Sequence, residues 1–370
     1  MSKTKTDIIT DEAMELLKQL IAIPSFSKEE DKTASLIEEF LNGHGVDTRR
    51  HLNNVWATNL HFDEKKPTLL LNSHHDTVRP NSAYTVDPFS PIEKDGKLFG
   101  LGSNDAGGSL VSLISAFVFY YEEPSLPFNL ILAATAEEEI SGKNGIESLL
   151  ALLPHIDCGL VGEPTLMQMA IAERGLMVLD GIAEGKAGHA ARNEGENALY
   201  KAIDDINWIR AYAFENNSDL LGPVKMTVTS IETENKTHNI IPSSCRFIVD
   251  VRINERYTHE QVLHTIKQNV KSRIEARSCR LRSSMIEKDH PLVRAGLDLG
   301  KTCYGSPTSS DKALMPFPAL KMGPGDSARS HTADEFIFTE EIKEGIAGYI
   351  ELLKRVDFRE KTLSTATSNR

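Results

Sequence analysis

Apolar positions along this chain follow two different patterns. Helical spacing appears in a segment that Asp11 can cap and that stops at Pro24, and again from about Lys28 to Gly43 or Gly45. Farther along, helical segments alternate with short apolar runs, namely Leu69–Leu71, Leu130–Ala134, Gly159–Val161 and Ala319–Met322. Uninterrupted runs of this kind are typical of strands buried on both faces. The pattern therefore predicts an α/β fold in which a mixed sheet lies between layers of helices.

The pattern changes between about residue 176 and residue 288. Strands are expected at Val178–Ala183, Val224–Ile231, Arg246–Ile253 and Arg280–Ile286, with helices at Glu196–Phe214 and after Thr258, which can cap the second one. The order βαββαβ is that of a ferredoxin-like sandwich. We therefore predict a first domain at 1–175 and 289–370, with a second domain, 176–288, inserted into it. The polar tail after about Phe358 is expected to be disordered.

Histidine and acidic residues follow every one of the four apolar runs. In chain order they are His74 and Asp76, then Glu137, Glu138 and Glu139, then Glu163, and finally His331. Another acid, Asp105, lies in a glycine-rich stretch just before an apolar helix. Any one of these residues alone would usually be a solvated loop side chain. Because ligands of open α/β sheets bind outside the carboxyl ends of the strands, their convergence predicts a site at that edge.

The residue types at this edge point to metal ions. Histidine and carboxylate ligands without cysteine fit a catalytic zinc site better than a structural one. With one ligand from each of the five segments, two histidines and three carboxylates exceed what one ion with an open position needs, and they suit two ions that share a bridging carboxylate. The same donors are also compatible with manganese or cobalt.

The ordered set of motifs resembles a family of dimetal amidohydrolases and peptidases. That family includes acetylornithine deacetylase, succinyl-diaminopimelate desuccinylase, aminoacylase and glutamate carboxypeptidases such as carboxypeptidase G. The resemblance runs from His74 to His331, with the inserted domain in its expected place. It implies a zinc-exopeptidase-like α/β/α catalytic domain with a ferredoxin-like domain that serves as a lid and in dimerisation.

The resemblance implies a set of metal ligands. His74 and Glu163 would bind the first metal ion. Glu139 and His331 would bind the second, and Asp105 would bridge the two.

Other positions near the ligands would have different roles. Glu138 would act as general base, and Asp76 would orient the His74 ring. Glu137 stands where the family has Asp, at a position that is not a ligand. His75 matches no role and is expected to be structural or solvated.

Residues of the inserted domain match the family's contacts to substrate. His189, in the segment Gly185–Ala191, would reach the oxyanion from the partner subunit of a homodimer, although Asn193 replaces the Pro that usually follows four residues later. Asn239 and Arg252 match positions that hold the acyl carbonyl and the substrate carboxylate. Arg252 could also be an ordinary charge on an exposed strand face. Ser309, outside the inserted domain, lies in the loop before the last motif, where the family often contacts substrate.

Composition narrows the choice of partners. The chain has 370 residues, and its 41 basic and 53 acidic residues give a formal net charge of −12. This balance argues against a nucleic acid or an anionic membrane as partner. Cys158, Cys245, Cys279 and Cys303 are dispersed without a CxxC pair, and the polar N-terminus lacks a signal core. No apolar window approaches 18 residues, so we expect no membrane span and a cytoplasmic location.

The expected substrate is a small N-acyl amino acid. The Gly323–Gly325 turn and the residues after His331 look most like the acetylornithine deacetylase branch, which implies N2-acetyl-ornithine or N2-succinyl-ornithine and a role in arginine biosynthesis. Asp311 and Asp326 could then hold the distal ammonium.

Other functions are also weighed. Succinyl-diaminopimelate desuccinylase, a broad aminoacylase, a dipeptidase, a metallo-aminopeptidase and a non-catalytic binding protein of this fold are the alternatives. A Ser-His-Asp hydrolase is disfavoured because no Gly-x-Ser-x-Gly elbow is present.

Overall fold

The computed structural model describes residues 3–192 and 194–358, and the chain divides into two compact units. Unit 1 comprises Met1–Ile171, Met285–Tyr304 and Ser310–Arg370, and unit 2 comprises Ala172–Ser284 and Gly305–Ser309. Ser309 therefore falls in unit 2 and not in the discontinuous first domain where we had expected it. Its hydroxyl donates to the carbonyl of Arg174, 2.8 Å away, which attaches it to that unit. The predicted disordered tail and Asn193 lie outside the described residues.

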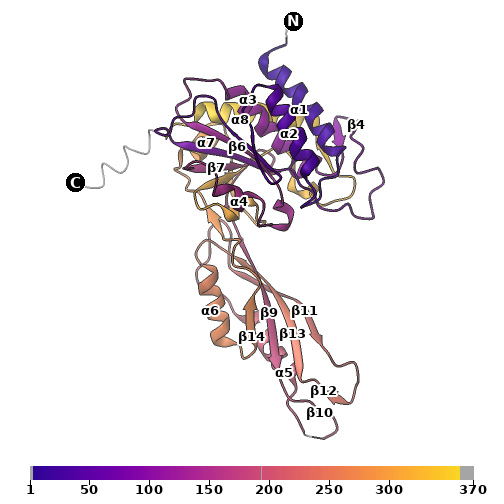
Figure 1. Cartoon of the computed structure of the whole chain (residues 1–370). Helices are drawn as coiled ribbons and strands as arrows, with labels where there is room; N and C mark the ends of the chain where they lie inside the picture. Colours follow the sequence, from indigo (N-terminus) through magenta and orange to yellow (C-terminus); the bar gives the residue numbers. More distant parts are fainter. Residues whose placement is uncertain (1–2, 193, 359–370) are drawn as a thin grey trace, which may run out of the picture. The chain divides into compact units, whose positions relative to one another are not determined.

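Unit 1 is built on one large mixed sheet (Figure 1). The strands along its main path are β1 (Arg49–His51), β2 (Asn54–Thr58), β6 (Asn129–Thr135), β3 (Thr68–His74), β7 (Cys158–Val161), β17 (Ala319–Lys321), β8 (Met169–Glu173) and β15 (Ser284–Met285), in this order, and β16 (Cys303–Ser306) also pairs with β8. The predicted mixed α/β fold is confirmed.

The four predicted apolar strands are neighbours at the centre of this sheet and run parallel. Leu71 of β3 lies opposite Leu132 of β6 and Leu160 of β7, and Ala319 of β17 lies opposite Gly159. Every residue of these four strands is buried, as expected for strands covered on both faces. Their carboxyl ends consequently share one edge of the sheet.

Helices cover both faces of the sheet. On one face α1 (Lys5–Ile21), α3 (Gly108–Tyr120), α7 (Pro291–Asp298) and α8 (Thr339–Arg355) pack together. On the other, α4 (Ile146–Leu150) and the short helix η3 (Asp311–Leu314) close an apolar cluster that contains Trp56, Leu70 and Ile131. Helix α2 (Asp31–Gly43) packs along β2. Helix α1 begins well before Asp11, because Thr4 and Asp7 form a capping box at its start.

A small antiparallel sheet fixes the loops beside the carboxyl edge. It consists of β4 (Ile92–Lys94), β5 (Lys97–Phe99) and β18 (Phe336–Phe338). Phe336 pairs with Phe99, so the segment after His331 runs beside the segment that leads to Asp105. Asp105 itself lies in the turn η1 (Ser103–Gly107), directly before α3.

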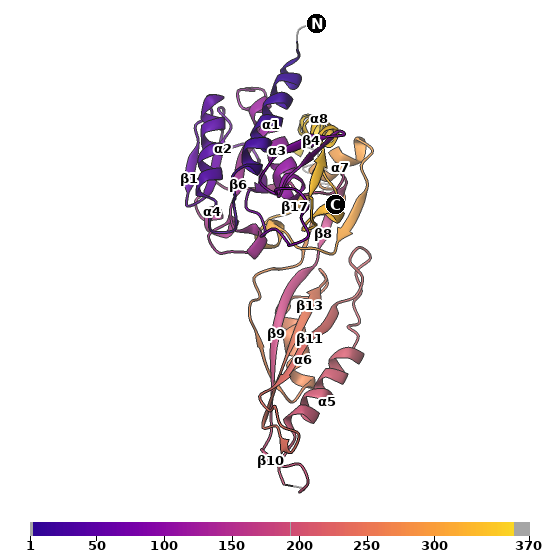
Figure 2. The same ribbon diagram turned by 90° about the vertical axis from the view of Figure 1, so that its right-hand side faces the viewer.

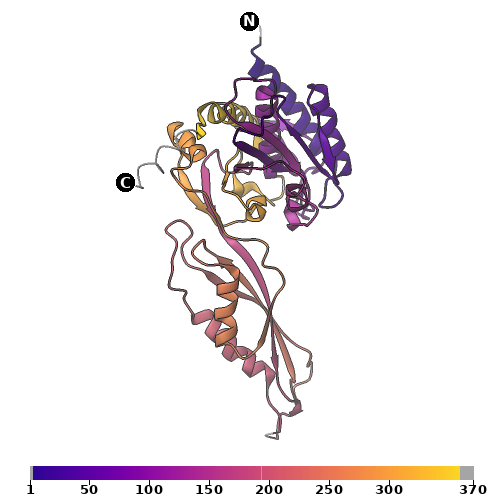
Figure 3. The same cartoon turned by 60° about the vertical axis from the view of Figure 1, so that its left-hand side comes forward.

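Unit 2 has the predicted βαββαβ order. Its elements are β9 (Gly175–Glu184), α5 (Ala198–Ala211), β11 (Lys225–Thr233), β13 (Ser244–Ile253), α6 (His259–Asn269) and β14 (Arg273–Ala276). The sheet order β11-β13-β9-β14 is that of a ferredoxin-like fold. Helices α5 and α6 lie side by side on one face (Figures 2 and 3), over the apolar cluster of this unit.

One predicted strand of this unit was misplaced. The last strand of its sheet is β14 and not Arg280–Ile286, of which only Ser284–Met285 is extended, as β15 of the large sheet. β14 was not expected because, of its four residues, only Ile274 is fully buried, and a strand this short carries too weak an alternation. Among the helices of the described residues, none is long and apolar enough to cross a membrane.

Candidate active site

His74 is the last residue of β3 and lies at the carboxyl edge of the sheet. Its Nδ1 is 3.0 Å from the backbone oxygen of Asp76, so this nitrogen carries a proton and donates it. Its Nε2 is buried and makes no hydrogen bond to any residue that the structure describes. A buried polar atom without a partner is costly, and a bound metal ion would satisfy it.

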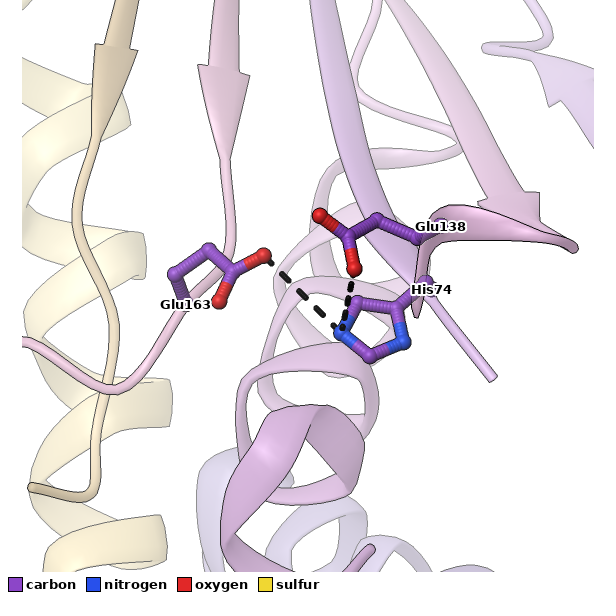
Figure 4. A group of neighbouring side chains, drawn as sticks. All are labelled: His74, Glu138 and Glu163. Atoms are coloured by element: carbon purple, nitrogen blue, oxygen red, sulfur yellow. Dashed lines mark ion pairs between the residues drawn. The ribbon is translucent and has the colours of Figure 1, made fainter. Parts of the chain in front are cut away.

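Carboxylates from three separate segments surround this nitrogen. The distances from His74 Nε2 are 3.4 Å to Asp105 Oδ1, 3.8 Å to Glu138 Oε2 and 3.9 Å to Glu163 Oε1. Figure 4 shows Glu138 and Glu163 approaching the ring nitrogen from two sides. Donor atoms placed about 2 Å from one tetrahedral ion lie about 3.3 Å apart. The spacing and the chemistry of these groups therefore fit a divalent cation.

Asp105 lies between the two predicted histidine ligands. Its Oδ1 faces His74, and its Oδ2 is 3.6 Å from Nε2 of His331. The same nitrogen of His331 is 3.0 Å from Glu139 Oε2. Each oxygen of one carboxylate thus faces a different imidazole, which is the arrangement that a carboxylate shared by two ions requires. All five residues predicted as ligands are brought together at this edge.

Asp76 joins His74 to the acidic turn η2 (Glu138–Ile140). Its Oδ1 is 3.4 Å from His74 Nδ1 and accepts a hydrogen bond of 3.1 Å from the backbone N–H of Glu138. Its Oδ2 accepts from the backbone N–H of Glu139 and from the Ser27 hydroxyl, at 3.2 and 2.7 Å. One buried carboxylate therefore fixes the ring of His74 and the backbone of two neighbouring acids.

The site places like charges close together in a buried setting. Burial raises the pKa of Glu138 well above its usual range, and the charges of nearby carboxylates such as Glu163 add to this against the opposing effect of His74. Burial alone would lower the pKa of His74, but the surrounding carboxylates raise it well above the ordinary value. The hydrogen bond to Glu139 raises the pKa of His331 to about 9. The metal-free site therefore holds protons that a cation would displace.

Two buried acids lie beside the site, and the sequence analysis gave neither of them a role in the metal centre. Asp311 accepts a 2.7 Å hydrogen bond from the Thr135 hydroxyl, and burial raises its pKa to about 6. Asp311 is 4% exposed, whereas Asp326 is partly exposed, and a contact of either with a substrate ammonium stays a prediction. Glu335 is also buried, and burial raises its pKa to about 7. Its place four residues after His331 was the only signal in the sequence.

Glu137 and His75 have structural roles. Glu137 accepts hydrogen bonds from the side chain and backbone of Asn144, at 2.9 and 3.3 Å, and so points away from the ligand group. His75 bonds Thr33 and the carbonyl of Asn53, both at 2.9 Å. Burial lowers the pKa of His75 to about 4, so it is a neutral, satisfied core histidine.

The remaining predicted site residues, His189, Asn239, Arg252 and Ser309, belong to unit 2. The N–H of Ala190, next to His189, donates to the carbonyl of Asn239 at 2.9 Å, so these two residues are neighbours. Both lie beyond the Ser244 end of β13, whereas Arg252 lies near the other end of the same strand. Eight residues of strand span about 27 Å. Within unit 2, Arg252 is therefore far from His189 and Asn239, and it forms a two-point ion pair with Asp250, at 2.9 and 3.1 Å.

The fold and the site together define an α/β protein with a carboxylate–histidine cluster that could hold divalent cations. Comparison with known families agrees, because the model of Peptidase family M20/M25/M40 matches residues 70–355. The chain belongs to this family, whose members hydrolyse amide bonds.

Curated relatives include two desuccinylases. The chain is 29% identical over 268 residues to succinyl-diaminopimelate desuccinylase of Cereibacter sphaeroides, covering 68% of this chain and 70% of the relative. It is 25% identical over 278 residues to succinyl-diaminopimelate desuccinylase 2 of Ruegeria sp., covering 70% and 69%.

Solved structures share the fold of almost the whole chain. A tripeptidase of Staphylococcus aureus matches with a TM-score of 0.75 at 19% identity, covering 94% of this chain and 98% of that one. The YXEP protein of Bacillus subtilis, described as a dinuclear metal-binding peptidase of the M20 family, matches with a TM-score of 0.71 at 15% identity, covering 94% and 98%.

Proposed function

We propose that this chain is a two-metal amidohydrolase that removes the acyl group from a small N2-acyl amino acid. The observation that carries the proposal is the Asp105 carboxylate between His74 and His331, with one oxygen toward each imidazole. His74 and Glu163 would hold one ion, Glu139 and His331 the other, and Asp105 both. Zinc is the proposed metal, and cobalt or manganese would suit the same donors.

The chemistry would divide between the ions and Glu138. Two bound divalent ions would lower the pKa of a water molecule and polarise the amide carbonyl. Glu138 would accept the proton of that water and pass it to the leaving nitrogen. Asp76 would hold the His74 ring and the Glu138 backbone in fixed positions relative to each other.

Groups on unit 2 would bind the substrate. His189 and Asn239 would donate hydrogen bonds to the carbonyl oxygen as negative charge develops on it. Arg252 would pair with the substrate carboxylate through the nitrogen that Asp250 leaves free. Because His189 and Arg252 lie at opposite ends of one sheet, a small substrate would meet both only if two copies of unit 2 contributed. The proposed assembly is therefore a homodimer through unit 2.

The acyl group and the amino acid are the finer part of the proposal. N2-acetyl-ornithine and N2-succinyl-ornithine are the first candidates, with a role in arginine biosynthesis, and the dispersed cysteines keep the cytoplasm as the expected location. The similarity to two succinyl-diaminopimelate desuccinylases favours the succinyl group and makes succinyl-diaminopimelate the second candidate.

A substrate panel tests the proposal. The purified chain is loaded with Zn²⁺ or Co²⁺, and kcat/KM is measured for acetyl-ornithine, succinyl-ornithine, acetyl-citrulline, acetyl-methionine and succinyl-diaminopimelate. We expect kcat/KM to be highest for the two ornithine compounds. A tenfold preference for acetyl-methionine would contradict an ammonium site, because it amounts to about 1.4 kcal/mol in favour of a neutral side chain. Activity on none of the amides would count against the amidohydrolase function itself.

A further inference from the structure

Glu335 places a buried carboxylate against the turn that carries Asp105. The side chain lies in unit 1, and the residue is 2% exposed. Its Oε1 accepts hydrogen bonds from the backbone N–H groups of Asn104 and Asp105, at 2.8 and 2.9 Å. Its Oε2 accepts a third from Gly102, at 3.1 Å. Three N–H groups of one turn thus converge on a single carboxylate, as they do in backbone nests that bind anions.

A second set of hydrogen bonds joins the same two segments, but here the turn of Asp105 supplies the side chain and the segment of His331 supplies the backbone. The side chain of Asn104 accepts a hydrogen bond from the backbone N–H of Asp326 and donates one to its carbonyl, both at 3.0 Å. Asn104 also donates to the Ser330 hydroxyl at 3.4 Å. We call this reciprocal arrangement the Glu335–Asn104 clasp. It joins the turn of Asp105 to the segment on which His331 lies.

The clasp holds the segments of some of the proposed ligands but not those of others. Asp105 and His331, which lie on the two clasped segments, would both bind the second ion with Glu139. His74 and Glu163 come from the ends of β3 and β7, and Asp76, not Glu335, holds the His74 ring.

We propose that Glu335 is a positioning residue that sets the orientation of Asp105 toward the second metal ion. The proposal rests on the two-metal centre proposed above. A glutamine at this place would offer one oxygen and an NH₂ group, so a donor would face one of the three N–H groups. The turn would then relax, and the geometry between Asp105 and His331 would change. Partners that orient metal ligands in this way commonly contribute about 10–100-fold in metal affinity.

The test is a metal titration of the full-length chain after metal removal. Zn²⁺ binding is measured by chelator competition in the wild type, Glu335→Gln and Glu335→Asp, and Co²⁺ binding is followed by visible absorption. His331→Ala identifies which binding step belongs to the second ion. In Glu335→Gln we expect second-site affinity to fall about tenfold or more and first-site affinity to fall less, because His74 and Glu163 are held independently of the Asp105 turn. The cobalt spectrum of the second ion should change as well.

Asp334→Asn is the matched control. Asp334 is the neighbouring carboxylate and also accepts backbone N–H bonds, but from Thr85 and Val86, at 2.8 and 3.2 Å, and not from the Asp105 turn. The Zn²⁺ affinity of the second site in the Asp334→Asn protein should stay within about twofold of wild type. Equal losses in Asp334→Asn and Glu335→Gln would overturn the proposal.

Other outcomes are equally decisive. Wild-type second-site affinity and cobalt spectrum in a folded Glu335→Gln protein would refute the positioning role while leaving the two-metal centre intact. If neither Glu335 variant folds without metal, the carboxylate supports the fold and not the ligand, which also overturns the proposal. If the wild type itself binds fewer than two ions, the proposed metal centre fails instead.

Discussion

At the residue scale, three consecutive acids have different surroundings. Glu137 is held by Asn144, Glu139 lies against His331, and Glu138 faces His74 with a raised pKa. We predict that Glu138→Ala retains two bound metals and lowers kcat about 10²–10⁴-fold, because it removes only the proton acceptor. Asp105→Ala is the contrast and should lose both ions.

Metal content by elemental analysis and kcat on the same preparations check this pair. Loss of metal from Glu138→Ala would place the general base elsewhere in the triplet. Two ions retained in Asp105→Ala would show that this carboxylate does not bridge.

The two histidines of the site predict a pH dependence of metal binding. The hydrogen bond to Glu139 raises the pKa of His331 to about 9, so its ring is expected to be protonated at pH 7 without metal, and the carboxylates around His74 raise the pKa of that ring as well. A metal needs the lone pair of Nε2, so loading should release protons, and metal affinity should fall as the pH drops from 9 to 6. Calorimetric titration in buffers of different ionisation enthalpy measures the release. His331→Ala should release about one proton fewer, and zero release from the wild type would contradict the pKa shifts.

At the element scale, the ligands depend on how closely the ends of the central strands pack. Gly162 follows β7 and precedes Glu163, and a Cβ there would lie 2.7 Å from the Leu113 side chain and 3.1 Å from that of Ser109. Gly162→Ala should therefore destabilise the chain by about 1–3 kcal/mol and displace Glu163, which weakens metal binding.

A second glycine provides the control for this prediction. A Cβ on Gly43, at the end of α2, would meet no described heavy atom within 4 Å, so Gly43→Ala should stay within about 0.5 kcal/mol of wild type. Denaturant unfolding of both variants without metal gives the comparison. Equal stabilities would show that the β7 end tolerates a methyl group.

At the scale of the whole molecule, unit 2 offers surfaces for self-association. Tyr200 and Ile203 on α5 are 67% and 40% exposed, and β11 is an edge strand with Ile231 45% exposed. Exposed apolar side chains beside an open strand edge favour pairing with a second chain. In the proposed homodimer, the second copy would supply His189 to the substrate site.

Mixed dimers test whether His189 acts across subunits. His189→Ala and Glu138→Ala chains are each expected to be inactive, and mixing them should restore roughly a quarter of wild-type activity. Half of randomly mixed dimers are heterodimers, and each holds one complete site. Heterodimers are verified with two affinity tags. Verified heterodimers without activity would show that His189 does not act in trans.

The sequence by itself determined the central strands and the chemistry at their ends. Leu69–Leu71 and Leu130–Ala134 were recognisable because strands buried on both faces are apolar without interruption, a local signal. The βαββαβ order of unit 2 followed from alternation and from Thr258, which caps α6. The convergence of histidine and acidic residues was expected because parallel strands bring their carboxyl ends to one edge, and the choice of ligands among them came from the family resemblance. The start of α1 and the strand β14 were missed, since a capping box can extend a helix and a short strand carries little periodicity.

Tertiary structure alone decided what each acid contacts. No local pattern shows that Asp311 is buried against Thr135, or that the carboxylate of Glu335 binds a turn more than 200 residues earlier in the chain. These pairings join segments far apart in sequence, and they depend on strand register and loop path. The orientation of Asp105 between two histidines likewise arises only when η1, β3 and the segment of His331 are assembled. Residue types can be read locally, but the distances that make them a site come from long-range packing.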